Sequence, residues 1–170
     1  MSWAVSLMKA SEDAVTLEDV PEGYSHLGTV AQVIERLRSI IPKEWFDNDD
    51  DGTLPVAWFG AHGDATSGGV ECDVYSLRIY LQTLEDEAEP GTTPATAMPA
   101  TALDTVVCVF LAFKPVGNPH RDMSHPVWDF IAAACRLLEC RAEDDARFLG
   151  ADGRPIPLPE PKRPWWSFWR

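Results

Sequence analysis

Apolar residues recur at two different spacings in the first part of the chain. Residues 3–7 alternate between large apolar and smaller or polar side chains, which predicts a short strand with one buried face. From Thr29 onward the spacing becomes three and four residues, as in an amphipathic helix. Gln32 can complete a capping box with Thr29, and Pro42 ends the predicted helix. Its apolar face consists of Val30, Val33, Ile34, Leu37 and Ile41.

Later apolar segments predict three strands and a second helix. The helix has Ser124 as its cap and Pro126 in its first turn, where a missing amide costs least. Its apolar face consists of Val127, Phe130, Ile131, Ala134, Cys135 and Leu138. The glycine-rich segment 60–69 predicts a turn or bulge, and a last short strand is expected within 140–149. The three strands are predicted at 55–60, 70–84 and 106–113. In the second of them, side chains alternate between two faces, with Tyr75, Leu77, Ile79 and Leu81 on one and Ser76, Arg78, Tyr80 and Gln82 on the other.

This order of elements predicts an α+β fold that approximates a split βαβ plan. We expect an antiparallel sheet of four to five strands with two helices packed on one face. Segment 106–113 is almost continuously apolar, which indicates a central strand covered on both faces. With both helices on one face, part of the other face would be free to receive a further segment of the chain.

The chain divides into one domain and an arm. Residues 1–150 are predicted to form a single α+β domain, with 85–101 as a mobile loop insertion that is acidic first and then rich in threonine, alanine and proline. Residues 151–170 form a proline-rich arm that should run extended. We expect the arm to dock on its own domain or in an oligomer contact; a membrane surface comes second and a partner protein third. Its aromatic tail includes Trp165, Trp166 and Trp169.

The net charge of the chain favours some classes of binding partner and disfavours others. The chain has 27 acidic and 14 basic residues, a net charge of −13, and the share of residues 1–149 alone is −15. Such a body repels phosphate backbones, so nucleic-acid binding is not expected. It attracts a basic protein partner, since complementary charge raises association rates. The alternative is that the charge serves solubility alone.

The four cysteines are expected to be reduced thiols in a cytoplasmic protein. The first residues lack the basic start and apolar run of a signal peptide, and no apolar run has the length of a membrane-spanning helix. Cys108 falls in an apolar strand and Cys135 on an apolar helix face, where cysteine acts as a small hydrophobic residue. Cys135 and Cys140 do not have the spacing of a metal site, and no cofactor is expected.

One acidic segment matches the opening of a calcium-binding loop. Asp47, Asp49 and Asp51 alternate ahead of Gly52, but the twelfth position is Trp58 where a bidentate glutamate is required. We therefore favour a solvated acidic turn, with a weak calcium site as the alternative. The aromatic pairs 45–46 and 58–59 flank this turn, and we expect them to fill the core rather than form a binding surface.

The histidines are not part of a recognisable catalytic motif. His62, Asp64 and Ser67 share one glycine-rich loop, and a triad needs side chains that converge from separately anchored positions. Turn chemistry explains this segment better. His120 and His125 are expected to be surface loop residues, because a closed zinc site needs four ligands at characteristic spacings.

The chain resembles a set of small bacterial cytosolic proteins. The likeness lies in the opening segment 2–8, the helix around 30–41, and the late helix followed by residues 140–144. Such proteins are similar in size, acidity and architecture to immunity proteins of bacterial toxin systems. The resemblance implies a non-enzymatic binding protein and transfers no site residues, and the threonine–proline loop and the aromatic arm depart from it.

These observations lead to one hypothesis and two rivals. The hypothesis is an immunity-type inhibitor that meets a basic toxin with its acidic surface. The rivals are a membrane-peripheral adaptor held by the tryptophan tail, and a small hydrolase that uses His62 and Asp64. The candidate contacts of the hypothesis are Asp47, Asp49, Asp50, Asp51, Glu85, Asp86 and Glu87.

Overall fold

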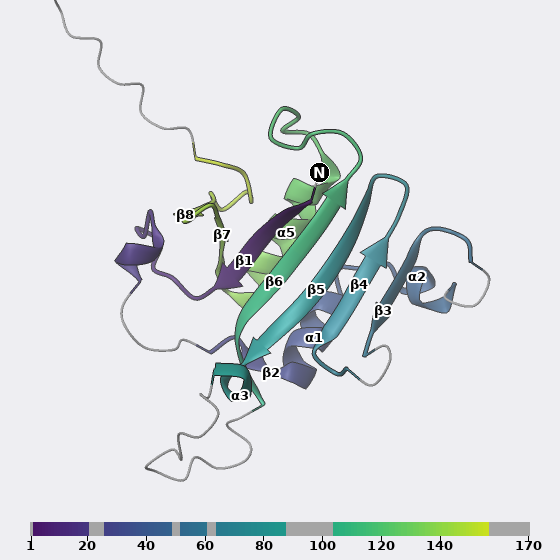
Figure 1. Cartoon of the computed structure of the whole chain (residues 1–170), viewed down its shortest axis with the longest axis horizontal. Coiled ribbons are helices and arrows are strands. Elements are labelled where there is room, and N and C mark those ends of the chain that lie inside the picture. The colour runs from purple at the N-terminus through teal and green to yellow at the C-terminus, as the bar shows by residue number, and fades with distance from the viewer. Residues whose placement is uncertain (1, 21–25, 49–51, 61–63, 88–103, 157–170) are drawn as a thin grey trace, which may run out of the picture.

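An antiparallel sheet forms the larger part of the structure, a computed structural model that describes residues 2–20, 26–48, 52–60, 64–87 and 104–156 (Figure 1). The strands lie in the order β3-β4-β5-β6-β1-β7-β8, and the short β2 also pairs with β6. The strands are β1 (Trp3–Met8), β2 (Gly28–Thr29), β3 (Val56–Phe59), β4 (Ser67–Glu71), β5 (Tyr75–Thr83), β6 (Thr105–Pro115), β7 (Arg141–Asp144) and β8 (Arg147–Phe148). The helices are η1 (Leu17–Asp19), α1 (Val30–Arg38), α2 (Lys43–Asp47), α3 (Leu84–Glu87) and α5 (Pro126–Leu138).

The α+β class and the antiparallel sheet are confirmed, and the long helices α1 and α5 both lie behind one face of the sheet (Figure 1). The predicted number of strands was too low, because the described residues alone form a sheet of eight. Segment 70–84 is two strands, β4 and β5, joined by a tight turn in which the Cys72 amide donates to the Tyr75 carbonyl at 3.0 Å. Segment 140–149 is likewise a hairpin of β7 and β8. The first turn has only three residues, 72–74, so it leaves little trace in the hydrophobic pattern.

Two glycines lie within β4, where a turn or bulge was predicted. Gly68 and Gly69 pair with Phe59 and Trp58 of β3. A Cβ atom on Gly68 would come within 2.4 Å of the Phe59 ring, and one on Gly69 within 2.2 Å of the Trp58 ring. The glycines therefore belong to a strand because the aromatic rings of the neighbouring strand lie over them.

The capping box of α1 is confirmed. The Thr29 amide donates to Gln32 Oε1 at 3.0 Å, and the Gln32 amide donates to Thr29 Oγ1 at 3.4 Å. The helix ends at Arg38, earlier than predicted, although Ile41 is still buried. Pro42 is the residue that precedes the short helix α2.

The cap of α5 is His125 rather than Ser124. His125 Nδ1 accepts from the Val127 amide at 3.3 Å, while the Ser124 amide and hydroxyl both donate to Asp122. Further into the helix, Trp128 is fully buried. The side chains of the first turn thus anchor α5 against the preceding loop.

The core lies between the sheet and the two long helices. β6 pairs with β5 on one side and with β1 on the other, so its predicted central position is confirmed. The prediction that it is covered on both faces was wrong, because Phe110 is 36% exposed. Fully buried contributors to the core are Leu7, Val33, Leu37, Leu77, Ile79, Leu111, Trp128 and Ile131.

The first residues of the predicted arm pack on α5. Gly153 is buried, and Arg154 donates to the Met123 carbonyl at 2.8 Å and pairs with Asp129 at 3.2 Å. The remainder of the arm, with its tryptophans, lies outside the described residues, as does the predicted loop beyond Glu87.

Candidate functional site on the open face of the sheet

The two faces of the sheet differ in what covers them. In β5, Tyr75, Leu77, Ile79 and Leu81 are buried, while Arg78 and Tyr80 are exposed on the opposite face. The alternation that the sequence predicted for this strand is confirmed. In Figure 1 the helices α1 and α5 lie behind the sheet, and its front carries no described helix across β1, β4, β5 and β6. We call this front side the open face.

One row of the open face is a stack of an indole and a guanidinium. Register places Trp58 opposite Gly69, and Gly69 opposite Arg78. The Arg78 guanidinium lies over the Trp58 ring, 4.7 Å from its centroid. Because Gly69 has no side chain, the Trp58 indole can lie against β4. This indole in turn holds the Arg78 guanidinium in place.

The next row is a pair of exposed aromatic rings. Tyr80 of β5 lies directly opposite Phe110 of β6, and the two side chains are 49% and 36% exposed. Small residues continue these rows into β1, where Ala4 pairs with Ala112 and Ser6 with Phe110. Cross-strand neighbours of this kind stabilise each other only through their facing sides, so the outer sides of both rings remain available for contact. Trp58, Arg78, Tyr80 and Phe110 together are called the aromatic patch.

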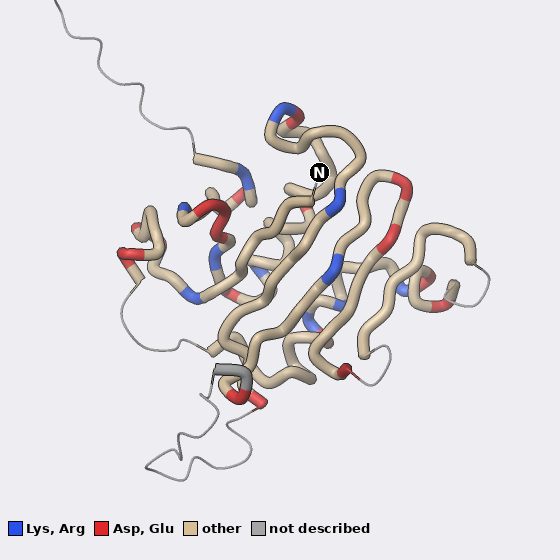
Figure 2. The backbone as a smooth tube through the Cα atoms, in the orientation of Figure 1, with Lys and Arg blue, Asp and Glu red and all other residues tan. Residues whose placement is uncertain are grey.

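Few charges lie around the aromatic patch. The four central strands β1, β4, β5 and β6 contain only Glu71, Arg78 and Lys114 as charged residues, although the chain has a net charge of −13. Neither Arg78 nor Lys114 forms an ion pair with a residue that the structure describes. In Figure 2 the acidic positions lie mainly in the hairpin ends and the peripheral segments. The centre of the open face is therefore nearly neutral within an acidic protein.

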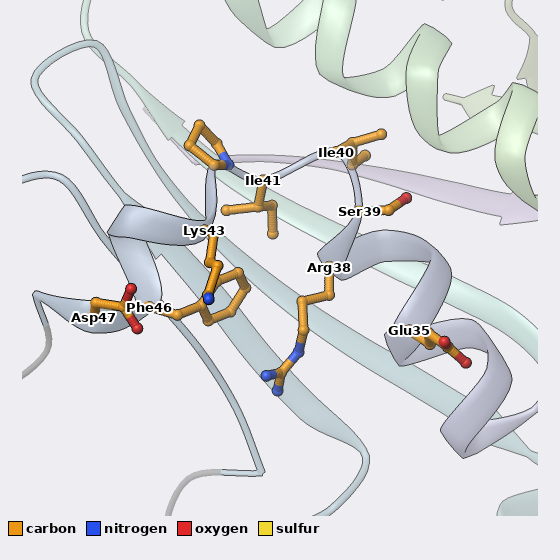
Figure 3. A pocket seen from close by; sticks show the side chains of 9 residues that line it. Glu35, Arg38, Ser39, Ile40, Ile41, Lys43, Phe46 and Asp47 are labelled. Carbon is orange, nitrogen blue, oxygen red and sulfur yellow. The ribbon is translucent and has the colours of Figure 1, made fainter.

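A groove between α1 and α2 is a second feature with charged side chains (Figure 3). It encloses about 680 Å³, and the Arg38 guanidinium lies 4.7 Å from the centroid of the Phe46 ring. Arg38 of α1 and Lys43 of α2 bring two cations to it, with Glu35 and Asp47 at its edges. No histidine or cysteine is among its described lining residues.

The acidic residues expected to contact a partner fall into two separate places. Asp47 is exposed at the end of α2, beside β3 at the edge of the sheet. Glu85 is exposed in α3, which lies at the ends of β5 and β6 (Figure 1). Asp86 and Glu87 belong to the same short helix. Of the other predicted contacts, Asp49, Asp50, Asp51, Trp165, Trp166 and Trp169 lie outside the described residues.

Asp64, one of the residues of the hydrolase hypothesis, has a local structural role. Its Oδ1 accepts from the Thr66 hydroxyl at 2.7 Å and from the Thr66 amide at 2.9 Å. These hydrogen bonds lower the pKa of Asp64. The carboxylate thus closes the turn that leads into β4, and His62 lies outside the described residues.

The histidines of the 118–125 loop also have structural roles. His125 was expected on the surface but is buried, and both of its ring nitrogens are engaged: Nδ1 accepts from Val127, and Nε2 lies 3.1 Å from the Val116 carbonyl. The His120 ring packs edge-on against Trp3 and Trp128. Within the described part of the chain, no group of three histidine, cysteine, aspartate or glutamate side chains is placed to hold a metal ion.

Sequence reasoning missed the aromatic patch. Trp45, Phe46 and Phe59 pack against the core as expected, but Trp58 lies on the open face instead. Arg78 and Tyr80 were visible as the polar side of an alternating strand. Phe110 was hidden within a continuous apolar run, and only the register of β5 against β6 shows that it meets Tyr80.

Comparison with protein-family models, curated proteins and solved structures found no match to this chain. Among the described residues, none of the helices is long and apolar enough to cross a membrane. The function is therefore inferred from the residues and their geometry.

Proposed function

We propose that this protein is a non-enzymatic binding module that holds a basic protein partner against the open face of its sheet. The observation that carries the proposal is the aromatic patch, in which Trp58, Arg78, Tyr80 and Phe110 lie side by side on a sheet face that no described helix covers. Tryptophan, tyrosine and arginine are the residue types most enriched at the energetic centres of protein interfaces.

The aromatic patch has two properties of a binding centre: apolar surface that a partner can cover, and a side chain that is ordered before binding. Full burial of a large apolar side chain contributes about 1.5–3 kcal/mol; Tyr80 and Phe110 are 49% and 36% exposed, so a partner that covers their remaining surface gains about 1–2.5 kcal/mol. Arg78 is already stacked on Trp58, and a side chain held before binding loses less conformational entropy when the complex forms.

The surrounding charge favours a basic partner. The chain carries −13 in total, while the central strands contribute one acidic and two basic residues. The acidic residues of the described chain therefore lie mainly outside these strands, where they can guide a cationic protein toward a nearly neutral centre. The specific form that we propose is an immunity-type inhibitor whose partner is a bacterial toxin with a basic surface, as the resemblance described above implies.

Site-specific photo-crosslinking tests this function. A photoreactive amino acid replaces Tyr80 in the full chain, and the matched control carries it at Leu17, an exposed apolar residue of η1 away from the patch. Both proteins are irradiated in the source cells at the same expression level. We expect one basic protein to be captured from position 80 and not from position 17, and Arg78→Ala to reduce the yield.

Three results would contradict the proposal. Equal capture of the same protein from position 17 would place the contact elsewhere. Capture of nucleic acid or of lipid from position 80 would assign the patch to another class of partner. A purified captured protein that binds equally well to wild type and to the Tyr80→Ala, Arg78→Ala double variant would show that the patch does not contribute to binding.

A further inference from the structure

The C-terminal end of α5 brings two cysteines into contact. Glu139 has left-handed backbone angles (φ 50°, ψ 50°), and its amide donates to the Arg136 carbonyl at 3.4 Å. The Cys140 amide donates to the Cys135 carbonyl at 3.0 Å. These two hydrogen bonds define a Schellman motif, which places the side chains of its first and last residues against each other. In this protein both side chains are thiols.

The two thiols are not equivalent. The Cys140 thiol donates a hydrogen bond to the Cys135 sulfur, which lowers the pKa of Cys135, and the Arg141 guanidinium acts in the same direction. The same hydrogen bond, together with burial, raises the pKa of Cys140. The negative end of the helix dipole opposes a thiolate at this position, and the hydrogen bond and the nearby cation offset it. Cys135 is therefore the sulfur that is better prepared to act as a nucleophile.

Small molecules can reach this pair. Both sulfur-bearing residues are partly buried and line a cavity of about 510 Å³, together with Arg136, Arg141 and Ile156. The other two cysteines differ: Cys108 is buried, and the Cys72 thiol donates to the Tyr75 carbonyl at 3.4 Å. None of the four forms a disulfide in the structure.

The pair also lies beside a structural junction. The Arg141 guanidinium donates to the carbonyls of Ser11, Ala14 and Leu149, so it ties the loop after β1 to the end of the β7–β8 hairpin. On the other side, Lys9 donates to the Glu139 carbonyl at 2.6 Å. Lys9 thus holds the helix end that carries the cysteines, while Arg141 holds together the segments beside it.

We propose that Cys135 and Cys140 form a reversible dithiol site that a peroxide oxidises to an intramolecular disulfide. The Cys135 thiolate attacks one peroxide oxygen, an S–O bond forms, the O–O bond breaks, and the leaving hydroxide takes a proton to become water. The Cys140 sulfur then attacks Cys135, an S–S bond forms, and the sulfenic oxygen leaves as a second water. Two electrons pass from the two sulfurs to the peroxide, and a thiol reductant reverses the reaction. This site is independent of the proposed partner surface.

Mass spectrometry of the intact protein tests the site. The reduced full chain is treated with one equivalent of hydrogen peroxide and then alkylated. We expect the mass before alkylation to fall by about 2 Da, for two hydrogen atoms, and alkylation to leave Cys135 and Cys140 unmodified, with the new bond mapped to these two residues and removed by dithiothreitol. The Cys140→Ser variant should instead accumulate a sulfenic acid at Cys135 that dimedone labels. The Cys72→Ser variant is the matched control and should form the disulfide as wild type does.

Other outcomes would overturn the proposal. Equal formation of a disulfide by Cys135→Ser and by wild type would assign the reaction to other cysteines. Oxidation of Cys72 ahead of the pair, or conversion of Cys135 to sulfinic acid with Cys140 unchanged, would show that the two thiols do not act together. Because each variant replaces one partly buried sulfur by oxygen, circular dichroism before treatment checks that it is folded.

Discussion

The contact between Trp58 and Gly69 can be tested by adding one methyl group. In Gly69→Ala the new Cβ would lie 2.2 Å and 2.5 Å from two atoms of the Trp58 ring, and 2.8 Å from the Leu77 carbonyl oxygen. Real atoms do not approach this closely, so the indole must leave its place against β4. Because Arg78 stacks on that indole at 4.7 Å, the displacement also removes the cation–π contact.

Two effects with opposite signs determine the size of the change. Alanine in place of glycine restricts the unfolded chain and favours the strand by about 0.5–1 kcal/mol. Overpacking costs about 1–3 kcal/mol, and loss of the cation–π contact adds about 0.5–1 kcal/mol. The net expectation is that Gly69→Ala lowers the free energy of unfolding by about 1–3 kcal/mol, measured by urea denaturation followed by far-UV circular dichroism. Glu71→Ala, on the same strand and the same face, is the matched control and should change it by less than about 0.5 kcal/mol.

A double-mutant cycle with Trp58→Ala isolates the ring. Once the indole is absent, the 2.8 Å approach to the Leu77 carbonyl remains but the closer approach to the ring is gone, so the ring's share of the cost should vanish. We expect a coupling energy of at least about 1 kcal/mol between the two positions. If the two changes were additive within about 0.5 kcal/mol, the indole would not lie on Gly69, and the arrangement described for the aromatic patch would be wrong.

Three further predictions concern the parts that support the sheet. Trp128→Phe should lower the free energy of unfolding by about 1–3 kcal/mol in urea denaturation, because the Pro119 and Asp122 carbonyls would each lose an indole donor at 3.2 Å in a buried site. Gly153→Ala should cost about 1–2 kcal/mol and raise hydrogen exchange in residues 150–156, since φ is +74° there and the new Cβ would lie 2.7 Å from the Trp128 carbonyl; unchanged exchange would mean that this segment does not pack on α5. Hydrogen bonds from the Ser124 hydroxyl and amide lower the pKa of Asp122, so its contribution to stability is complete above about pH 4 and is lost as the pH falls through the lowered pKa. The difference in stability between wild type and Asp122→Asn should therefore shrink between pH 6 and pH 2, and a constant difference would contradict this.

Local patterns in the sequence were sufficient for the elements whose causes are local. The capping box of Thr29 and Gln32, the helical spacing of 126–138 and the alternation in β5 each depend on residues within a few positions of one another. The strand count was too low because the turns at 72–74 and 145–146 interrupt segments that read as continuous, and because the two-residue strand β2 was missed. A turn of two or three residues leaves little trace in a hydrophobic pattern.

The candidate site was harder to predict because its residues meet only through strand pairing. Trp58, Arg78 and Phe110 come from three strands, and their proximity depends on the registers of β3 with β4, β4 with β5, and β5 with β6. No spacing in the sequence encodes these registers. The prediction that His125 is a surface residue failed for the same reason. Its roles as a helix cap and as a partner of the Val116 carbonyl depend on the path of the 118–125 loop.

Net charge and the aromatic patch should act on different steps of binding. The central strands β1, β4, β5 and β6 hold only Glu71, Arg78 and Lys114 as charged residues, so the net charge of −13 acts on a partner mainly from outside them and is screened beyond about 8 Å at physiological salt. Added salt should therefore lower the association rate constant with a basic partner and leave the dissociation rate constant nearly unchanged. Tyr80→Ala removes a contact made only in the complex, so it should raise the dissociation rate constant about tenfold or more. Surface plasmon resonance separates the two: if salt and Tyr80→Ala changed the same rate constant, the division into an acidic surround and an aromatic centre would be wrong.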